Sequence, residues 1–543
     1  MRAVWLTTNY GLDWPKTKAK NENGRVRQQR EIIKILDRLQ AANFNTVMLQ
    51  TRLRGDVIYP SKIECWSAVL TGKEGGNPGY DPLQFIIEQC HKRHMECHAW
   101  IVTIPLGNQS HIKMQGKASV ANNRPDMCKK HQNEYYLDPG NPETAPYILS
   151  IVKEIVENYD VDGIHLDYIR YPEKAASFPD QGTFKKYAPK GMSLQEWRRE
   201  NISRIVYTLY NWIKLHKPHV KLSSAPLGRY TNMPEAPAPG WNAYETVYQD
   251  VKAWIEQEKH DFIIPMMYAK GKYFDPYLYQ WKKIARNCPV IPGLGAYQLE
   301  SGEGDWPLEA LLQQIDLSRL ANVDGQGFYR VENLFNRRKQ LWESLCHHYY
   351  AYPALPPLMN GRDSVPPQPP IDLTLDFCEN NTWKCTWQHT DSLESDKLTY
   401  ALYAFPAHVT DTNDPKYLVA ANIREPIFTL LPETLPENTE YIAVSAIDKA
   451  YNESVPSPLV SLYNDTYNGG KIPLRKGKEP GFYTIEHIKE IDKIAVFNLC
   501  NELVDKQTYE NKPFKFDTIQ PGTYKVVLAD KKGTLHTFIW NKD

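Results

Sequence analysis

The sequence predicts an α/β protein, a (β/α)8 TIM barrel followed by two small β-sandwich domains. In residues 1–350, eight short apolar runs alternate with segments of helical period, which is the pattern of a parallel sheet. A proline-rich segment then covers 351–365 and marks a linker. After it, short runs with period-two alternation are separated by turn residues, as in a β-sandwich.

The eight predicted strands are short and largely apolar. They cover 3–8, 46–51, 96–103, 163–168, 221–226, 262–268, 290–296 and 325–330. The helices that follow them cover 25–42, 82–94, 142–158, 194–217, 244–259, 274–286, 308–320 and 337–350. Eight such pairs fit a barrel, which needs roughly 250 residues or more. An open doubly wound sheet would often carry a Gly-rich phosphate turn after the first strand, and this sequence has none there.

Long connections follow the second, third and fourth predicted strands, at 52–81, 104–141 and 170–194. In a barrel these segments lie at the carboxyl ends of the strands, where barrel enzymes keep their active sites. The unequal enlargement of this rim predicts a cleft that is long enough for an extended substrate.

The region after the linker divides into two predicted domains. Residues 366–464 resemble a fibronectin type III domain, with Trp387 at the core tryptophan position and Tyr441 at the tyrosine corner. Residues 465–543 form another strand-rich unit, which resembles the small β-sandwiches that end many exported proteins.

Composition excludes some classes of function. Lys+Arg and Asp+Glu both number 64, so the basic surplus of a nucleic-acid-binding protein is absent. No apolar run approaches the roughly 20 residues of a membrane-spanning helix. The 14 Trp, 34 Tyr and 16 Phe residues favour carbohydrate as a ligand, because flat rings suit sugar faces. The nine cysteines form no C-x-x-C pair and are expected to be free thiols.

The segment VDGIHLDYIRYP at 161–172 is the strongest candidate for chemistry. Alternation along its strand places His165 and Asp167 on one face, toward the barrel axis, with Asp167 at the carboxyl end. We expect Asp167 to be catalytic, and His165, Arg170 and Tyr171 to bind substrate beside it. Asp167 could instead cap the next turn.

Other predicted strand ends supply polar and aromatic residues to the same rim. After the second strand, Asp56 could reach the cleft or pair with a neighbouring arginine. The remaining expected substrate-binding residues are Trp5, Arg54, His98, Trp100, Tyr268, Tyr297 and Gln298. Each alone is more often a core residue than a ligand, but their convergence on one rim is informative.

Residues 2 to about 350 resemble the bacterial glycosyl-hydrolase-like 10 family. The matching segments are RAVWLTT, QTRLRGDVIYPS, HAWIV, DGIHLDYIRYP, IIPMMY, PGLGAYQ and GQGFYRVENL. The resemblance implies an enzyme of the cell envelope that cuts glycan strands, with peptidoglycan glycans stripped of stem peptides as the leading substrate. Relatives tend to carry Gln where this chain has Met266, which puts subsite contacts or activity in doubt.

Glycoside cleavage needs two carboxyl groups, one that holds a proton and one that is ionised. With Asp167 as the first, the expected second is Asp56, because its loop is the next most specific match, and then Glu235. Glu300 and Glu303 are further candidates.

Two alternatives stay open. A barrel without a competent carboxylate pair would be a non-catalytic glycan-binding protein. A metal-dependent hydrolase would need convergent ligands, for which His98, His165 and Asp167 are the available set, without an H-x-H pair. We expect no cofactor, no metal, no nucleic-acid partner and a polysaccharide ligand. We also expect an envelope or secreted location, reached through a removed N-terminal signal that in a lipoprotein would anchor the chain to a membrane.

Overall fold

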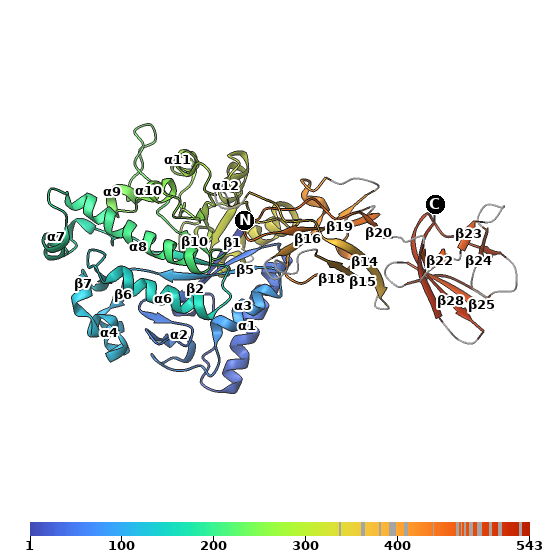
Figure 1. Ribbon diagram of the computed structural model, residues 1–543, viewed down its shortest axis with the longest axis horizontal. Helices are drawn as coiled ribbons and strands as arrows, with labels where there is room; N and C mark the ends of the chain where they lie inside the picture. Colours follow the sequence, from blue (N-terminus) through green and yellow to red (C-terminus); the bar gives the residue numbers. More distant parts are fainter. Residues whose placement is uncertain are drawn as a thin grey trace. The chain divides into compact units, whose positions relative to one another are not determined.

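The computed structural model describes most of the chain (Figure 1). The described residues are 1–335, 338–359, 364–378, 382–389, 398–406, 411–437, 439–462, 466–467, 470–471, 474–476, 482–485, 491–498, 502–508, 513–531 and 535–542. They divide into two compact units, Met1–Val365 with Lys449–Asn452, and Pro366–Asp448 with Glu453–Asp543. The described residues between 351 and 365 fall within the first unit, and their role as a linker stays a prediction. Among the described helices, none is both long and apolar enough to cross a bilayer.

The first unit is a barrel of eight parallel strands, as predicted. The strands are β1 (Arg2–Leu6), β2 (Thr46–Arg52), β5 (Glu96–Val102), β9 (Gly163–Asp167), β10 (Lys221–Ser224), β11 (Phe262–Ile263), β12 (Gly293–Gly295) and β13 (Gln326–Tyr329). They pair in the order β11-β10-β9-β5-β2-β1-β13-β12. Parallel bridges from Ile263 to Val290 and from Met266 to Gly293 join the two ends, so the sheet closes on itself.

Helices cover the outside of this barrel (Figure 1). They include α1 (Glu22–Ala41), α3 (Pro82–His91), α6 (Thr144–Asn158), α8 (Leu194–His216), α11 (Asp275–Ala285) and α12 (Leu308–Leu320). Their starts follow the expected capping chemistry. Asp81 accepts a hydrogen bond from the amide of Gln84 at the start of α3, and Ser193 with Glu196 forms a capping box on α8.

Two segments that were each predicted as one continuous helix are divided into shorter helices. The segment expected as one helix over 244–259 is two short helices, α9 (Ala243–Thr246) and α10 (Val251–Glu256), because Asp250 caps a new helix by accepting the amide of Ala253. The described part of the segment expected over 337–350 contains a 3-10 turn (Arg338–Gln340), α14 (Leu341–Ser344) and a π-helical turn (Leu345–Tyr349), and α13 (Val331–Phe335) precedes it. Residues 336–337 lie outside the described part.

The barrel interior is filled from alternate strand positions. Ala3, Trp5, Met48, Trp100, Ile264 and Ile291 form an apolar cluster there, apart from the larger core between strands and helices. A Cβ atom on Gly293 would lie 2.8 Å from the Trp5 ring. The glycine at the start of β12 therefore leaves the space that the Trp5 indole occupies. Below it, Lys221 and Glu96 form a buried ion pair of 2.8 Å.

The long loops at the carboxyl ends have secondary structure of their own. The β2 loop turns back at β3 (Asp56–Val57), which pairs with β2, and runs on to β4 (Cys65–Trp66) and α2 (Ala68–Thr71). The β5 loop forms a small antiparallel sheet in the order β6-β8-β7. Its strands are β6 (Pro105–Asn108), β7 (Cys128–His131) and β8 (Glu134–Leu137), and α4 (Gln109–Gln115) follows β6.

The second unit contains small antiparallel sheets, as predicted. One pair of sheets consists of β14 (Ile371–Cys378), β15 (Thr382–Gln388) and β18 (Ile427–Leu430), and of β17 (Leu418–Ile423), β16 (Thr399–Phe405), β19 (Tyr441–Ile447) and β20 (Val460–Ser461). Trp383, Trp387, Tyr400 and Leu402 lie in their common core. The three-plus-four arrangement is that of a β-sandwich. Its kinship with fibronectin type III, and the role of Tyr441, stay predictions.

The last part of the chain has a core of its own, around Tyr483, Ile494, Phe516, Val526 and Trp540. Its four-stranded sheet consists of β26 (Leu503–Thr508), β25 (Ile491–Phe497), β28 (Gly522–Asp530) and β29 (Leu535–Lys542). A three-stranded sheet consists of β23 (Leu474–Lys476), β24 (Phe482–Ile485) and β27 (Phe514–Lys515), and β21 (Thr466–Tyr467) pairs with β22 (Gly470–Lys471).

Candidate functional site

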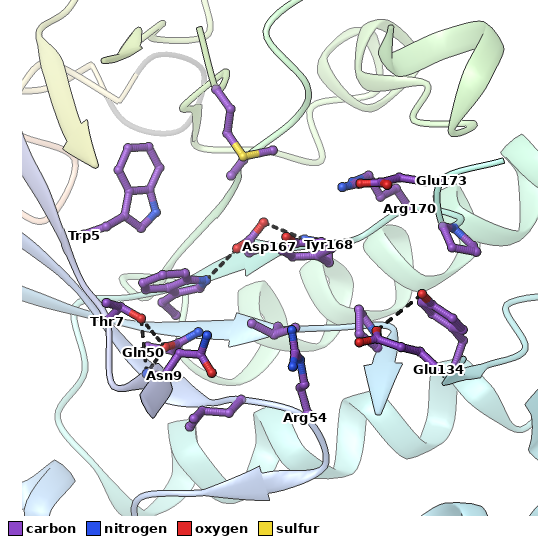
Figure 2. A pocket seen from close by; sticks show the side chains of 18 of the residues that line it. Trp5, Thr7, Asn9, Gln50, Arg54, Glu134, Asp167, Tyr168, Arg170 and Glu173 are labelled. Atoms are coloured by element: carbon purple, nitrogen blue, oxygen red, sulfur yellow. Dashed lines mark hydrogen bonds between the residues drawn. The ribbon is translucent and has the colours of Figure 1, made fainter. Parts of the chain in front are cut away.

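A pocket of about 550 Å³ opens at the carboxyl ends of the barrel strands (Figure 2). Side chains from several strand ends and from the long loops line it. Those with polar or aromatic side chains are Trp5, Thr7, Asn9, Gln50, Arg54, Trp100, His131, Gln132, Asn133, Glu134, Tyr136, Asp167, Tyr168, Arg170, Glu173, Tyr268, Tyr297 and Tyr329. Seven of the predicted site residues are among the lining residues: Trp5, Arg54, Trp100, Asp167, Arg170, Tyr268 and Tyr297.

Asp167 is the last residue of β9, and its carboxyl group is held by two hydrogen bonds. Trp100 Nε1 donates to Oδ2 at 3.1 Å, and the amide of Tyr168 donates to Oδ1 at 2.8 Å. Burial raises the pKa of Asp167 to about 6, against the opposing effects of Arg170 and of these two hydrogen bonds. The carboxyl group thus lines an open pocket and keeps a substantial protonated fraction near neutral pH.

Aromatic rings form one wall of the pocket. Tyr268, Tyr297 and Tyr329 contact one another with ring centroids 5.6 to 5.8 Å apart, and Tyr329 also meets the edges of Trp5 and Trp100. Tyr329 was not among the predicted site residues. Period-two alternation along β13 could have found it, because Phe328 packs in the outer core and its neighbour therefore faces the axis.

Polar groups complete the lining. Gln50 Oε1 accepts hydrogen bonds from Thr7 Oγ1 at 2.7 Å and from the amide of Asn9 at 2.9 Å, which fixes the β1 loop against β2. The Arg170 guanidinium lies 4.7 Å from the Tyr168 ring centroid, and its Nε is buried without a hydrogen-bond partner among the described residues. Arg54 and Arg170 place positive charge on the same pocket.

The pocket contains two carboxylates that were not predicted from the sequence, those of Glu134 and Glu173. Glu134 is the first residue of β8, and Glu173 follows the DGIHLDYIRYP segment directly. With Asp167 they are the acidic residues of the lining in the described structure. Side chains in an irregular loop do not alternate in direction at a fixed spacing. The sequence pattern therefore does not indicate which acidic residue of a long loop points into the pocket. For Glu173, adjacency to the motif was the one available signal.

The two acidic residues that were expected to assist Asp167 lie elsewhere. Asp56 lies outside this lining, and its Oδ1 accepts the backbone amide of Arg54 at 2.9 Å. It lines a second pocket of about 440 Å³, together with Glu74 and His111. Glu235 is exposed and lines neither pocket. Glu300 and Glu303 are also outside both linings, and Glu300 accepts from Asn333 at 3.2 Å.

Four predicted substrate-binding residues are likewise placed away from the pocket lining. His98 is fully buried and lies 2.9 Å from Glu96, deep in the barrel. His165 accepts the indole Nε1 of Trp5 at 3.0 Å, and burial lowers its pKa well below the usual range, so it positions Trp5 as a neutral imidazole. Gln298 donates to the Tyr297 hydroxyl at 3.1 Å.

Tyr171 packs behind the pocket, next to Arg198 and Tyr248. Alternation failed there because the strand ends at Asp167 and Tyr168 adopts a left-handed φ of 51°. The turn brings Tyr168 to the pocket and sends Tyr171 into the core.

The ligand set expected for a metal-dependent hydrolase does not converge. His98, His165 and Asp167 are absent from the groups of described residues whose ligand atoms lie together, and Asp56, Glu74 and His111 form such a group instead.

The chain is similar in sequence to known proteins. Residues 1–300 match the Glycosyl hydrolase-like 10 family. The chain is 30% identical over 477 residues to Glycosyl hydrolase YngK of Bacillus subtilis, covering 84% of this chain and 92% of that protein. It is 33% identical over 366 residues to Glycosyl hydrolase DigH of Escherichia coli K12, covering 62% of this chain and 83% of the relative.

Among solved structures, the glycoside hydrolase domain of PgaB (BpsB) from Bordetella bronchiseptica matches with a TM-score of 0.46 at 12% identity, over 63% of this chain and 97% of that one. The family match covers more than half of the chain, and the Bacillus relative is matched over nearly its whole length. The chain therefore belongs to the Glycosyl hydrolase-like 10 family.

Proposed function

We propose that this protein is a glycoside hydrolase that cleaves an extended bacterial polysaccharide, with Asp167 as its proton donor. The observation that carries the proposal is the Asp167 carboxyl group, which lines a ring-walled pocket and whose pKa burial raises to about 6. A general acid works best when its pKa lies near the working pH. The same combination of burial and partial protonation characterises the acid of known glycosidases.

The reaction would begin when Asp167 transfers its proton to the glycosidic oxygen. The C–O bond to the leaving sugar then breaks, and the anomeric carbon gains oxocarbenium character. A second, ionised carboxylate attacks that carbon or deprotonates a water molecule, at a separation of about 5–5.5 Å or about 6.5–9.5 Å from the first carboxyl. Glu134 and Glu173 are the other acidic residues of the lining, and we propose that one of them takes this role.

The leading substrate is the peptidoglycan glycan strand stripped of its stem peptides. Aromatic rings such as Tyr297 and Tyr329 suit the apolar faces of a sugar chain. Removal of the stem peptide leaves a lactyl carboxylate on every second sugar, and Arg54 and Arg170 would pair with such anionic groups. We further propose an envelope or secreted location, in which the β-sandwich regions act as spacers or attachment modules.

Incubation of the full chain with stem-peptide-free glycan strands tests the proposal. Wild type should generate new reducing ends. The rate of Asp167→Asn should be at least about 100-fold lower, because general acid catalysis usually contributes at least that factor. Glu235→Gln is the matched control, because Glu235 is exposed and outside the pocket. Retention of both proteins on the polymer without release from either would instead establish the alternative, a glycan-binding protein without hydrolytic activity.

Glu134→Gln and Glu173→Gln separate the two possible partners of Asp167. The variant that lacks the second carboxylate should lose activity. In the corresponding alanine variant, which leaves space at that position, added azide should restore cleavage by attacking the anomeric carbon. If both variants keep wild-type rates, neither glutamate assists and the two-carboxylate mechanism fails.

A further inference from the structure

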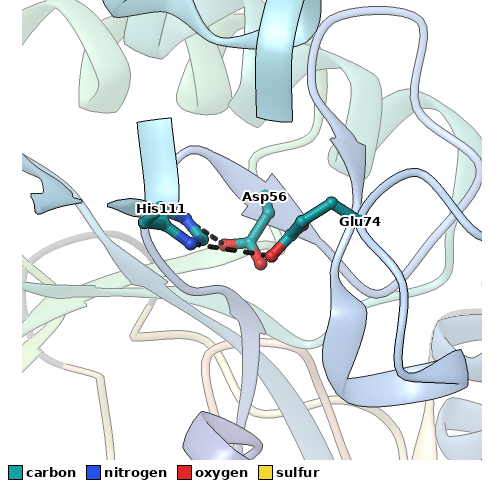
Figure 3. A group of neighbouring side chains, drawn as sticks. All are labelled: Asp56, Glu74 and His111. Atoms are coloured by element: carbon teal, nitrogen blue, oxygen red, sulfur yellow. Dashed lines mark ion pairs between the residues drawn. The ribbon is translucent and has the colours of Figure 1, made fainter. Parts of the chain in front are cut away.

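Three ligand-bearing side chains from separate segments of the chain meet beside the main pocket (Figure 3). Asp56 comes from β3, Glu74 from the loop after α2, and His111 from the first turn of α4. One donor atom from each lies within 4.8 Å of the other two. His111 Nδ1 is 3.6 Å from Glu74 Oε1, and His111 Nε2 is 3.9 Å from Asp56 Oδ1.

The Glu74 carboxyl group is buried without full compensation. Only 8% of its side chain is exposed, and its Oε2 has no hydrogen-bond partner among the residues that the structure describes. The Asp56 side chain is 2% exposed. In the described part of the chain, neither carboxylate has a lysine or arginine nitrogen within ion-pair distance. A buried carboxylate oxygen without a partner is costly, and a bound cation would offset that cost.

The His111 ring is oriented as metal-bound imidazoles usually are. Its Nε2 lies 3.1 Å from the carbonyl oxygen of Arg54 and 2.9 Å from the side-chain nitrogen of Gln115, and Asn108 caps α4 by accepting the His111 amide at 3.0 Å. When Nε2 carries the ring proton and donates it to the Arg54 carbonyl, His111 makes the common outer contact of a metal-ligating histidine, and the other nitrogen is free to coordinate. That nitrogen, Nδ1, is the one that faces Glu74.

We infer that Asp56, Glu74 and His111 bind one divalent transition-metal ion of the zinc or manganese class. An imidazole with two carboxylates suits such ions, whereas calcium takes six to eight oxygen ligands. Tetrahedral bonds of about 2.0–2.2 Å place ligand atoms about 3.3–3.6 Å apart, so small rotations of these side chains close the site. A fourth position would face the second pocket.

The ion would fix the rim of the substrate pocket and take no part in bond cleavage. Asn9, Leu53 and Arg54 line both pockets, and Arg54 lies in the turn that Asp56 closes. Coordination would tie this turn to α4 and to the loop after α2. Arg54 would thereby be held in place, while Asp167 would keep its own contacts.

Metal binding by the untagged full chain tests the inference. After dialysis against a chelator, Zn²⁺, Mn²⁺ and Co²⁺ are titrated separately, with bound metal measured by elemental analysis and the Co²⁺ ligand field by absorption. Wild type should bind one ion per chain, and a hundredfold excess of free metal over Kd should raise the Tm by roughly 5 °C. Glu74→Gln and His111→Gln should each weaken binding by at least about tenfold.

His91→Gln is the matched control, because His91 also lies between two carboxylates, Asp160 and Asp162, yet belongs to no convergent group of described residues. It should bind metal like wild type. Absence of stoichiometric binding to wild type, or equal binding by Glu74→Gln, overturns the inference. If His111→Gln fails to fold, the near-isosteric Glu74→Gln and the Co²⁺ spectrum still decide. No glycan is needed, so the result is independent of the proposed hydrolysis.

Discussion

The indole of Trp100 donates a hydrogen bond of 3.1 Å to the carboxyl group of Asp167, from the neighbouring strand of the barrel. This bond favours the ionised carboxylate, while burial favours the protonated acid. Because the pKa of Asp167 still rises to about 6, burial outweighs the indole, the Tyr168 amide and Arg170 together. The pKa of Asp167 therefore depends on opposing effects, and a single substitution that removes one of them should shift it.

Trp100→Phe should raise the pKa of Asp167 further, because it removes a donor to the ionised form. Loss of a hydrogen bond to a charged group, about 1.5 kcal/mol or more, corresponds to about one pH unit. The alkaline limb of kcat/KM against pH should therefore move upward by about one unit. Trp5→Phe also changes a pocket ring but removes a donor to His165, and it should leave that limb in place. An unmoved limb in Trp100→Phe would contradict this account.

Asp167→Asn should become more stable relative to wild type as the pH rises. The folded pKa of about 6 exceeds the ordinary aspartate pKa of 3.8, so the folded protein binds the proton more tightly than the unfolded chain does. Wild type loses this contribution as the pH rises through 6, by about 3 kcal/mol in total, and the variant has none to lose. Thermal unfolding of the barrel at pH 4 and pH 7.5 measures the difference. A variant that is no more stable relative to wild type at pH 7.5 than at pH 4 would contradict this prediction.

Much of the barrel follows from sequence because its signals are local. Each strand is a short apolar run, and alternation within β9 correctly places Asp167 in the lining of the pocket at the carboxyl end of the strand. The same rule explains the errors. His98 and His165 face the barrel axis as expected, but both are fully buried, in contact with Glu96 and Trp5 respectively. They lie below the pocket and do not line it.

The loops could not be predicted in this way. Whether Asp56 points toward Asp167 or toward His111 depends on the turn at Gly55, whose φ is +77°, and on contacts with α4 more than fifty residues later. Glu134 reaches the pocket only because β6, β7 and β8 form a sheet above it. Such placements depend on tertiary contacts that carry no sequence period.

Tyr297→Leu should weaken glycan binding without moving the pH profile. Its half-exposed ring lines the pocket and packs against Tyr268 and Tyr329. An aromatic contact is worth about 0.5–1.5 kcal/mol beyond its buried area, so Kd should rise by about 3- to 10-fold. Retention on glycan strands, measured in the inactive Asp167→Asn background, reports this. Tyr171→Phe is the control, and a change there as large as in Tyr297→Leu would contradict the placement of Tyr171 behind the pocket.

Arg52→Met should destabilise the barrel strongly, since Arg52 holds the β2 loop to the end of β5. It forms a bidentate ion pair with Glu64 at 2.7 and 2.8 Å, with side chains 1% and 2% exposed, and donates to the carbonyl oxygen of Thr103 at 3.2 Å. Removal of one partner leaves a buried carboxylate unpaired, at a cost of about 3–5 kcal/mol. Thermal or denaturant unfolding of the barrel gives the loss. Adding Glu64→Gln removes the stranded charge, so the double variant should regain most of the stability, and a double variant no more stable than Arg52→Met would show that packing around Arg52, rather than its charge, holds the loop.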